Sequence, residues 1–473
     1  MPTQALPHMS YESADEGQIR QARGKFLAMA AAYALGNFTD NFYRQGLALL
    51  AIAASLPQLQ GWATVVFALP FVLLAAPAGW LADRFAKRRV VVAAKLLEVA
   101  AAAVGAAGVL SGRWNLMLAM VALMGLQAAI FGPALNGSIP QLYPAWYVLK
   151  ANALLKVVTT AGILLGLLGA GLALECPGSL ANLPAGRWAL AAVVVAAALA
   201  GLAVSLRVPS FAPSNPAIRF PWSGPAHTLR TLAGVRRDRL LWQVIWADAF
   251  IWLVSSLQVQ MINLWGERLG FGPGLTASLT GLALAGLAGG GYLCGRRAAL
   301  GGTGFQPVPK RTGYKPVPPE AGGTGFQPVQ EKPGHRLQTC ATKWLSALPA
   351  AGAGLAACQA LAALVGLVGT GRVGPMPLAW LALAALTTGA GGAAGMWLVP
   401  LEAFIQARPS EGDRGRIIAA ANATAFVGIL LSGLVFLGCS QLPGGSGFFV
   451  AAGLSLLAAV LARRMIAEEH QKL

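Results

Sequence analysis

An acidic and a basic residue stand close together in the middle of the first long apolar run of the chain. Asp40 and Arg44 lie within about residues 26–54, whose flanks are rich in Ala, Leu and Phe. A carboxylate at the middle of a bilayer costs roughly 2.5–3.5 kcal/mol on insertion scales, so it has to face protein or water. At helical spacing the two residues are one turn apart on one face and can form an ion pair. Such a pair either fixes helix packing or lines a polar path for a substrate or ion.

Other polar residues inside apolar runs extend this pattern. The candidate lining of a polar path consists of Asp40, Asn41, Arg44, Gln127, Asn152, Lys156 and Asp248. A carboxylate can hold an ammonium group, and Arg or Lys can hold a phosphate. Asp248 has no charged neighbour within one turn, so it is either a proton-binding group or a partner in a hydrogen bond across the fold. Lys95 and Glu98, three residues apart, are expected to be a packing pair.

The composition is typical of a multi-pass membrane protein. Of the 473 residues, 56% are hydrophobic and only 11% are charged, and the mean hydropathy is +0.61. A soluble domain has charged side chains at roughly a quarter of its positions. The five cysteines show no C-x-x-C spacing, which indicates neither a metal site nor a disulfide framework. No cofactor is expected, and the polar residues 1–24 lack the apolar core of a cleaved signal peptide.

Twelve apolar segments have about the length that is needed to span a bilayer. They lie at about 26–54, 62–83, 90–111, 114–133, 149–174, 187–206, 240–265, 273–295, 344–369, 376–400, 416–440 and 446–463. Of the 35 Lys and Arg residues, the loops opposite the N-terminus hold only Arg113, Arg187, Arg268 and Arg372. By the positive-inside rule both termini are predicted to be cytoplasmic. This topology accounts for the net charge of +18 and argues against nucleic-acid binding.

Two long polar segments organise the chain. We expect a cytoplasmic tail at 1–24, a six-helix bundle at 25–206, a cytoplasmic linker at 207–239, a second six-helix bundle at 240–464 and a tail at 465–473. Within the second bundle, a cytoplasmic insert at about 297–343 contains a near repeat, because Gly301–Val308 recurs as Gly322–Val329. Gly, Pro and Thr at this density build no core, so the insert is predicted to be disordered. It either has no function of its own or binds anionic lipid headgroups through its basic residues.

The two predicted bundles repeat short sequence features in the same order. The matched pairs are Phe38–Phe42 with Trp246–Phe250, Gly79–Arg84 with Gly291–Arg296, Pro133 with Pro400, and Gly162 with Gly428. Repeated halves about an axis along the membrane normal are a transporter design, with the binding site near mid-membrane between the halves. The predicted fold class is therefore an all-α membrane protein of two pseudo-symmetric six-helix bundles.

The loop after the second apolar segment resembles a signature of the major facilitator superfamily. It reads Gly79-Trp-Leu-Ala-Asp83-Arg84-Phe-Ala86-Lys87-Arg88-Arg89, with Ala86 in place of the usual second glycine. The resemblance implies the twelve-helix major facilitator fold. It also implies a cytoplasmic gate that latches the two halves, formed by Gly79, Asp83, Arg84, Lys87 and Arg88. The alternative is a basic cytoplasmic turn without that role.

A narrower resemblance extends over nearly the whole chain. The segments that carry it are Asp40–Gln45, Leu69–Phe71, Ala82–Phe85, Lys95–Glu98, Gly125–Pro133, Ile139–Gln141, Asn152–Leu154, Val399–Gln406 and Arg414–Ala420. They resemble the bacterial lysophospholipid transporter family (LplT type). A similar membrane module occurs fused to enzymes in the 2-acylglycerophosphoethanolamine acyltransferase proteins. This chain has no His-x4-Asp acyltransferase motif, so it is not expected to be an enzyme.

This resemblance implies a flippase of the bacterial inner membrane. Its cargo would be lysophosphatidylethanolamine and similar single-chain lipids, moved inward for re-acylation, with a separate acyltransferase or acyl-ligase as a partner. Two positions depart from the family pattern, because Leu135 stands where the family has a lysine and Lys156 where it has a glutamate. Lys156 then either shifts the headgroup preference towards an anionic group or snorkels to the cytoplasmic side.

Two other functions fit the same residues. One is a proton-coupled exporter of drugs or small metabolites, with Asp40 and Asp248 as the proton carriers. The other is a membrane scaffold that presents lysolipid to a separate acyltransferase.

Overall fold

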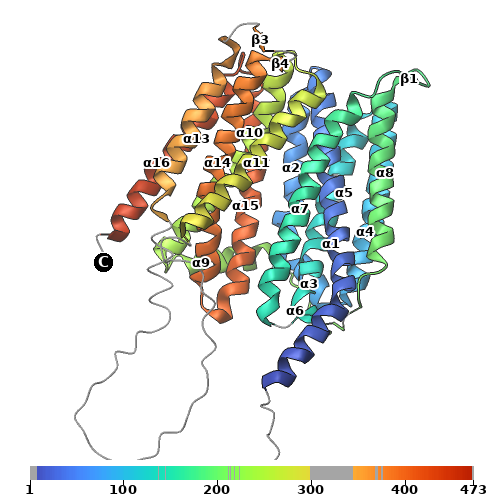
Figure 1. Ribbon diagram of the computed structural model, residues 1–473, viewed down its shortest axis with the longest axis vertical. Helices are drawn as coiled ribbons and strands as arrows, with labels where there is room; N and C mark the ends of the chain where they lie inside the picture. Colours follow the sequence, from blue (N-terminus) through green and yellow to red (C-terminus); the bar gives the residue numbers. More distant parts are fainter. Residues whose placement is uncertain are drawn as a thin grey trace, which may run out of the picture.

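Backbone polar groups in lipid have to be paired within the segment, and long apolar runs therefore fold as helices. The computed structural model describes residues 8–136, 138–143, 145–210, 212–213, 215–217, 219–222, 224–298, 345–367, 371–373 and 376–470. Long helices dominate this part of the chain (Figure 1). The predicted insert falls outside the described residues except for its first two, and so does Cys340. The other cysteines, Cys176, Cys294, Cys358 and Cys439, are free thiols.

The first half of the chain is helical from residue 8, so most of the predicted N-terminal tail continues the first helix. Its elements are α1 (His8–Ala53), α2 (Gln58–Leu73), α3 (Ala75–Arg84), α4 (Lys87–Ser111), α5 (Trp114–Asn136), α6 (Ile139–Leu142), α7 (Ala145–Leu174), β1 (Ser179–Leu180), β2 (Leu183–Pro184) and α8 (Ala185–Ser205). The two strands pair antiparallel, with Ser179 opposite Pro184.

The second half begins after a short helix in the predicted linker, α9 (Gly224–Val235). Its elements are α10 (Arg239–Arg268), α11 (Pro273–Ala298), α13 (Leu348–Ala363), a 3-10 turn (Val365–Leu367), β3 (Arg372–Val373), β4 (Met376–Pro377), α14 (Leu378–Ala407), α15 (Glu411–Cys439) and α16 (Gly447–His470). The strands β3 and β4 also pair antiparallel.

Each of the predicted apolar segments coincides with a helix or a pair of helices. In the described part of the chain, 9 helices are long and apolar enough to cross a membrane, or 10 if the bent pair α2 and α3 forms one span. The other two segments are α1, whose middle carries Asp40 and Arg44, and α13, which has only 16 residues. The chain is therefore a multi-pass membrane protein with the predicted fold class.

The second span is broken between α2 and α3. The two helices meet at an angle of 55° on either side of Leu74. Pro77, in the first turn of α3, has no N–H with which to bond the carbonyl of Leu73. Loss of this bond allows the bend, which turns α3 away from the axis of α2 and sets the course of the signature loop.

The two halves lie side by side, with α1–α8 in blue to green and α10–α16 in yellow to red (Figure 1). Both strand pairs lie at one end of the bundle, which we call the hairpin end; α1 begins and α16 ends at the opposite, terminal end. The halves pack on each other through α2 against α15 and α7 against α11. Gly61 and Gly433 face each other there, because a Cβ at Gly61 would lie 2.9 Å from the carbonyl oxygen of Gly433.

The matched glycines of the two halves pack on equivalent helices. A Cβ at Gly162 of α7 would lie 2.5 Å from the carbonyl oxygen of Ala34 in α1. Gly428 of α15 packs in the same way on the carbonyl of Ala249 in α10. The fifth segment thus approaches the first, and the eleventh the seventh, at backbone-to-backbone distance, as expected for a repeated fold.

The closest helix contact in the second half joins α11 and α14. Gly290 of α11 lies on the backbone of Gly392 in α14, and Gly391 lies on the backbone of Ala283. Gly286, four residues before Gly290, lies on the carbonyl of Thr388 in α14 in the same way. Small residues at four-residue spacing allow membrane helices to approach closely. A side chain at either position would overlap the partner helix.

Replacing Gly290 by alanine is therefore expected to destabilise the protein by about 1–3 kcal/mol, the usual cost of overpacking. Gly289→Ala is a matched control, because this neighbouring glycine has nothing within 4 Å of the added Cβ. Both changes gain helix propensity equally. Thermal unfolding in detergent, followed by tryptophan fluorescence, compares them. Equal midpoint temperatures would contradict the close contact of α11 and α14.

Candidate functional site

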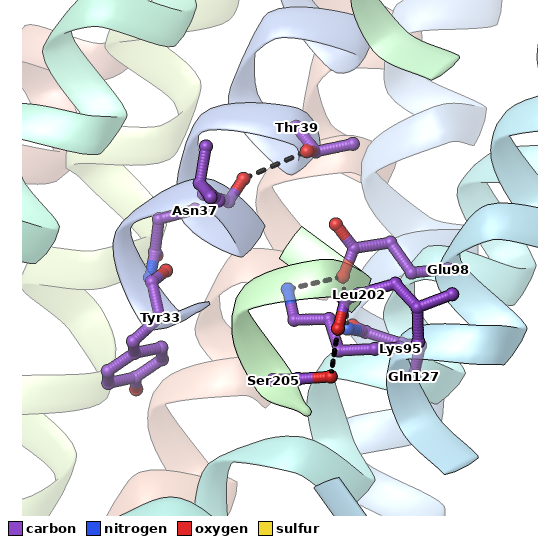
Figure 2. Close-up of polar contacts among 9 residues, drawn as sticks. Tyr33, Asn37, Thr39, Lys95, Glu98, Gln127, Leu202 and Ser205 are labelled. Carbon is purple, nitrogen blue, oxygen red and sulfur yellow. Dashed lines mark hydrogen bonds and ion pairs between the residues drawn. The ribbon is translucent and has the colours of Figure 1, made fainter. Parts of the chain in front are cut away.

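A cluster of buried charges lies inside the first half, between α1, α4 and α5. The ammonium of Lys95 is 2.6 Å from Oε2 of Glu98, and neither side chain is exposed. The amide Nε2 of Gln127 donates a second hydrogen bond of 2.7 Å to the same carboxylate oxygen. Figure 2 shows these three side chains converging between the helices. Lys95 and Glu98 thus form the predicted packing pair, and Gln127 adds a hydrogen bond to it.

Small residues and one aromatic ring make room for the ammonium of Lys95. A Cβ at Gly36 of α1 would lie 2.8 Å from Nζ of Lys95, and one at Gly201 of α8 would lie 3.3 Å away. On another side, Nζ lies 4.8 Å from the ring centroid of Phe131. The ammonium is therefore enclosed by two helix backbones and an aromatic face, a setting that leaves no room for water on the glycine side.

Asp40 and Arg44 join this cluster from α1 but do not form the predicted ion pair with each other. The guanidinium of Arg44 instead lies over the ring of Phe67 in α2, 4.1 Å from its centroid. Asp40 is 8% exposed, and the charges of Glu98, Lys95 and Arg44 act on it. One oxygen of Asp40, Oδ1, and one of Glu98, Oε1, are buried without a hydrogen-bond partner. We call Asp40, Arg44, Lys95, Glu98 and Gln127 the charge cluster.

The charge cluster combines two acids with two bases, so it is neutral when all four are ionised. Buried polar atoms without partners are rare in proteins, and each calls for an explanation. The two unpaired carboxylate oxygens can accept hydrogen bonds from a cationic or hydroxyl-bearing ligand. The guanidinium of Arg44 keeps donors available for an anion, because an aromatic ring occupies only its face.

The remaining predicted residues of the first half lie elsewhere. The side chain of Asn41 turns along its own helix and donates to the carbonyl of Asn37 over 2.8 Å. Asn152 and Lys156 of α7 are both exposed. Gly162 faces Ala34 and Gly166 faces Phe38, so α7 and α1 run alongside each other in step.

Lys156 is therefore separated from Asp40 along the helices. Gly162 is level with Ala34, so Lys156, six residues earlier in α7, is level with about residue 28 of α1. At 1.5 Å per residue this level is roughly 18 Å from Asp40, towards the terminal end. Leu135, the other departure from the family pattern, is fully buried in an apolar cluster with Phe131 and Ile139. Neither position contributes a charge to the charge cluster.

Asp248 lies in the second half and shares no contact with the charge cluster. It is buried on α10, and its Oδ1 has no hydrogen-bond partner. The charge of Glu402, from α14, acts on it. Nearby, the indole of Trp397 donates to the carbonyl of Ala247 over 3.4 Å. Among the described residues, the unpaired acid of the second half is thus separate from the two acids, Asp40 and Glu98, of the charge cluster.

The signature loop contacts the linker and the end of α8. The backbone N–H of Asn215 in the linker donates to the carbonyl of Asp83 over 2.9 Å. Arg88 donates to the carbonyl of Leu206 over 2.6 Å. The guanidinium of Arg84 lies 5.5 Å from the ring centroid of Trp80, and Lys87 is buried. Around Gly79 there is open space for a Cβ.

A second polar network joins the two halves towards the hairpin end, and the sequence analysis did not predict it. Gln45 of α1 and Asn263 of α10 exchange hydrogen bonds of 2.9 and 3.2 Å. Asn263 also donates to Oε1 of Gln60 over 3.0 Å, and Gln60 donates to the carbonyl of Gln260 over 3.0 Å. We call Gln45, Gln60, Gln260 and Asn263 the amide cluster.

All members of the amide cluster are buried, and hydroxyl groups extend it. Gln260 donates to Ser432 of α15 over 3.2 Å, and Ser432 donates to Ser256 over 2.8 Å. Thr280 of α11 reaches Asn263 over 3.5 Å. Uncharged amides inside an apolar helix were the only signal in the sequence. An uncharged amide in an apolar helix does not reveal in the sequence which helix supplies its partner.

Comparison with known proteins agrees with this architecture. The family model described as Major Facilitator Superfamily matches residues 25–306. Curated proteins named lysophospholipid transporter LplT, from Salmonella schwarzengrund (strain CVM19633) and Salmonella newport (strain SL254), are 32% and 31% identical to the chain over 194 residues. These matches cover 40% of this chain and 44% of each relative, less than half the length of the curated proteins.

Solved transporters share the fold over nearly their whole length. The crystal structure of a D-xylose-proton symporter superposes with a TM-score of 0.65 at 13% identity, covering 93% of this chain and 96% of that one. A mutant of the nucleoside transporter NupG gives a TM-score of 0.61 at 11% identity, covering 93% and 99%. At such identities the likeness shows the fold alone.

Proposed function

Because the chain belongs to the Major Facilitator Superfamily, we propose that it is a flippase that moves lysophospholipids across the bacterial inner membrane. The observation that carries this proposal is the similarity to proteins named lysophospholipid transporters, at 31–32% identity. The charge cluster supports it, because intramembrane charges in a transporter fold mark a substrate or ion path.

The charge cluster offers complementary groups for a zwitterionic headgroup. In this proposal the carboxylate of Asp40 receives an ethanolamine ammonium, and its unpaired Oδ1 supplies the acceptor. Arg44 binds the phosphate through its guanidinium edge. The single acyl chain stays against apolar helix faces. Lys156 and Asn152, which are exposed nearer the terminal end, meet the headgroup at a different stage of its passage.

The arrangement in the membrane and the partners belong to the same proposal. The terminal end, with both chain termini, faces the cytoplasm, as the distribution of Lys and Arg predicts. The units are the bundles 25–206 and 240–464, joined by the linker 207–239. A separate acyltransferase or acyl-ligase receives the delivered lysolipid, and Gly79, Asp83, Arg84, Lys87 and Arg88 act as the cytoplasmic gate.

Lipid movement in proteoliposomes that contain only this protein tests the proposal. Fluorescent lysophosphatidylethanolamine starts in the outer leaflet, and a membrane-impermeant quencher reports the fraction that remains there. We expect faster inward movement of the lysolipid than in protein-free liposomes, and no acceleration of a two-chain phosphatidylethanolamine. The measurement is repeated with and without a proton gradient, on vesicles of known protein orientation.

Each result decides between the functions. No acceleration of lysolipid under any of these conditions would contradict the flippase and leave the exporter of drugs or small metabolites and the scaffold that presents lysolipid. Movement that occurs only with a proton gradient would show proton coupling, for which Asp40 and Asp248 are the candidate carriers. Equal acceleration of one-chain and two-chain lipids would contradict selectivity for lysolipids.

A further inference from the structure

The amide cluster lies at the contact between the two halves of the chain. Its hydrogen bonds join α1 and α2 of the first half to α10 of the second. Close by, Oε1 of Glu175 at the end of α7 accepts a hydrogen bond of 2.8 Å from the backbone N–H of Gly274 in α11. Separation of the halves at the hairpin end breaks these contacts and leaves amide donors and acceptors without partners.

We propose that the amide cluster binds the free hydroxyl and the ester group on the glycerol of the lysolipid, and that it thereby distinguishes single-chain from two-chain lipids. This inference rests on the proposed function. In the conformation seen here, the amides of the two halves form hydrogen bonds with one another. When the halves part, the glycerol hydroxyl and the ester take over these hydrogen bonds.

The chemistry of the amide cluster matches an alcohol and an ester rather than a charge. Its members and the hydroxyls around them, Ser256, Ser432 and Thr280, carry no ionisable group. An amide offers both a donor and an acceptor, and a hydroxyl does the same. In addition, Oε1 of Gln260 is buried without a partner, in a side chain that is 3% exposed. This oxygen is an acceptor that the closed network does not use.

The position of the amide cluster relative to the charge cluster fits one small ligand. Gln45 directly follows Arg44 on α1, and it lies roughly 7.5 Å from Asp40 along the helix axis at 1.5 Å per residue. A phosphate at Arg44 is bonded to the glycerol whose hydroxyl has to be recognised. In this inference the two clusters hold adjacent parts of the same molecule, with the headgroup towards Asp40.

Such a site explains selectivity by physical means. A site that is built to bind a hydroxyl strongly rejects an analogue that lacks it, because the buried polar groups of the protein then remain unpaired. A two-chain lipid has an ester in place of this hydroxyl. It loses the donor, and it brings an acyl chain to a polar site between closely packed helices.

A comparison of two ligands on two proteins tests this inference. Lysophosphatidylethanolamine is compared with an analogue that carries hydrogen in place of the free glycerol hydroxyl. Binding is measured by displacement of a fluorescent lysolipid from purified protein, first with wild type and then with Asn263→Leu. Gln359→Leu is a matched control, because this amide is also buried and hydrogen-bonded, to Gln258 over 3.0 Å, but within the second half.

We expect wild type and Gln359→Leu to bind the natural lysolipid roughly tenfold more tightly than the analogue, a ratio that corresponds to 1.4 kcal/mol. Asn263→Leu should bind both ligands within about twofold of each other. Equal binding of both ligands to wild type would overturn the inference while leaving the proposed function intact, and so would a tenfold preference retained in Asn263→Leu. Should Asn263→Leu fail to fold, Gln60→Met serves in its place. Failure of wild type to bind either ligand would contradict the proposed function as well.

Discussion

Replacing Glu98 by glutamine is expected to destabilise the protein by about 3–5 kcal/mol. The change leaves the ammonium of Lys95 fully buried, enclosed by Gly36 and Gly201, with no carboxylate within 2.6 Å. Removal of one partner of a buried ion pair costs this much because the other charge remains uncompensated in a medium of low polarity. Thermal unfolding in detergent, followed by tryptophan fluorescence, should show a much lower midpoint temperature and a lower yield of monodisperse protein.

The double variant Lys95→Met with Glu98→Met is the control for this prediction. Replacement of a whole buried pair by apolar side chains of similar volume is often neutral or stabilising. The double variant should therefore be more stable than Glu98→Gln, even though it carries two changes. A Glu98→Gln protein that unfolds at the wild-type temperature would show that Lys95 does not depend on Glu98.

Replacing Asp40 by asparagine is expected to weaken the binding of lysophosphatidylethanolamine by tenfold or more. A hydrogen bond to a charged group contributes about 1.5–3 kcal/mol, and 1.4 kcal/mol corresponds to a factor of ten. Lysophosphatidylglycerol, which has no ammonium, should lose little affinity. Arg44→Gln should weaken both lipids, since both carry the phosphate that we assign to Arg44.

The two variants control each other, because each removes one charge from the same cluster. Displacement of a fluorescent lysolipid from purified protein measures both, with the unfolding temperature as the check on folding. Equal loss of both lipids in Asp40→Asn would contradict an ammonium site at this carboxylate. A preference for lysophosphatidylethanolamine that persists in Asp40→Asn would do the same.

The membrane architecture followed directly from the sequence. Apolar length and the low charge content predicted where the helices lie, because lipid forces the backbone of each spanning segment to bond internally. The break at Leu74 and the helical course of residues 8–24 were not predicted. Both depend on local effects, a proline at residue 77 and a polar sequence that continues a helix, and a hydropathy pattern does not register them.

The candidate site was predicted in part. Polar side chains within apolar runs pointed to Asp40, Arg44 and Gln127, and the i,i+3 spacing pointed to the pair of Lys95 and Glu98. The structure brings these residues into one cluster. Lys156 stays near the terminal end. Because α7 runs in step with α1, Lys156 and Asp40 differ in level along the helices by several turns.

By itself, then, the sequence determined the class of protein, the helices and the residues that are costly to bury. Those properties depend on composition and on spacing along one segment. Only the tertiary structure decided which side chains meet. Arg44 lies over Phe67 instead of pairing with Asp40, and Gln45, Gln60 and Asn263 bond across the two halves. The reason is physical: partners from different helices are selected by the way the helices pack, and one-dimensional spacing carries no record of that packing.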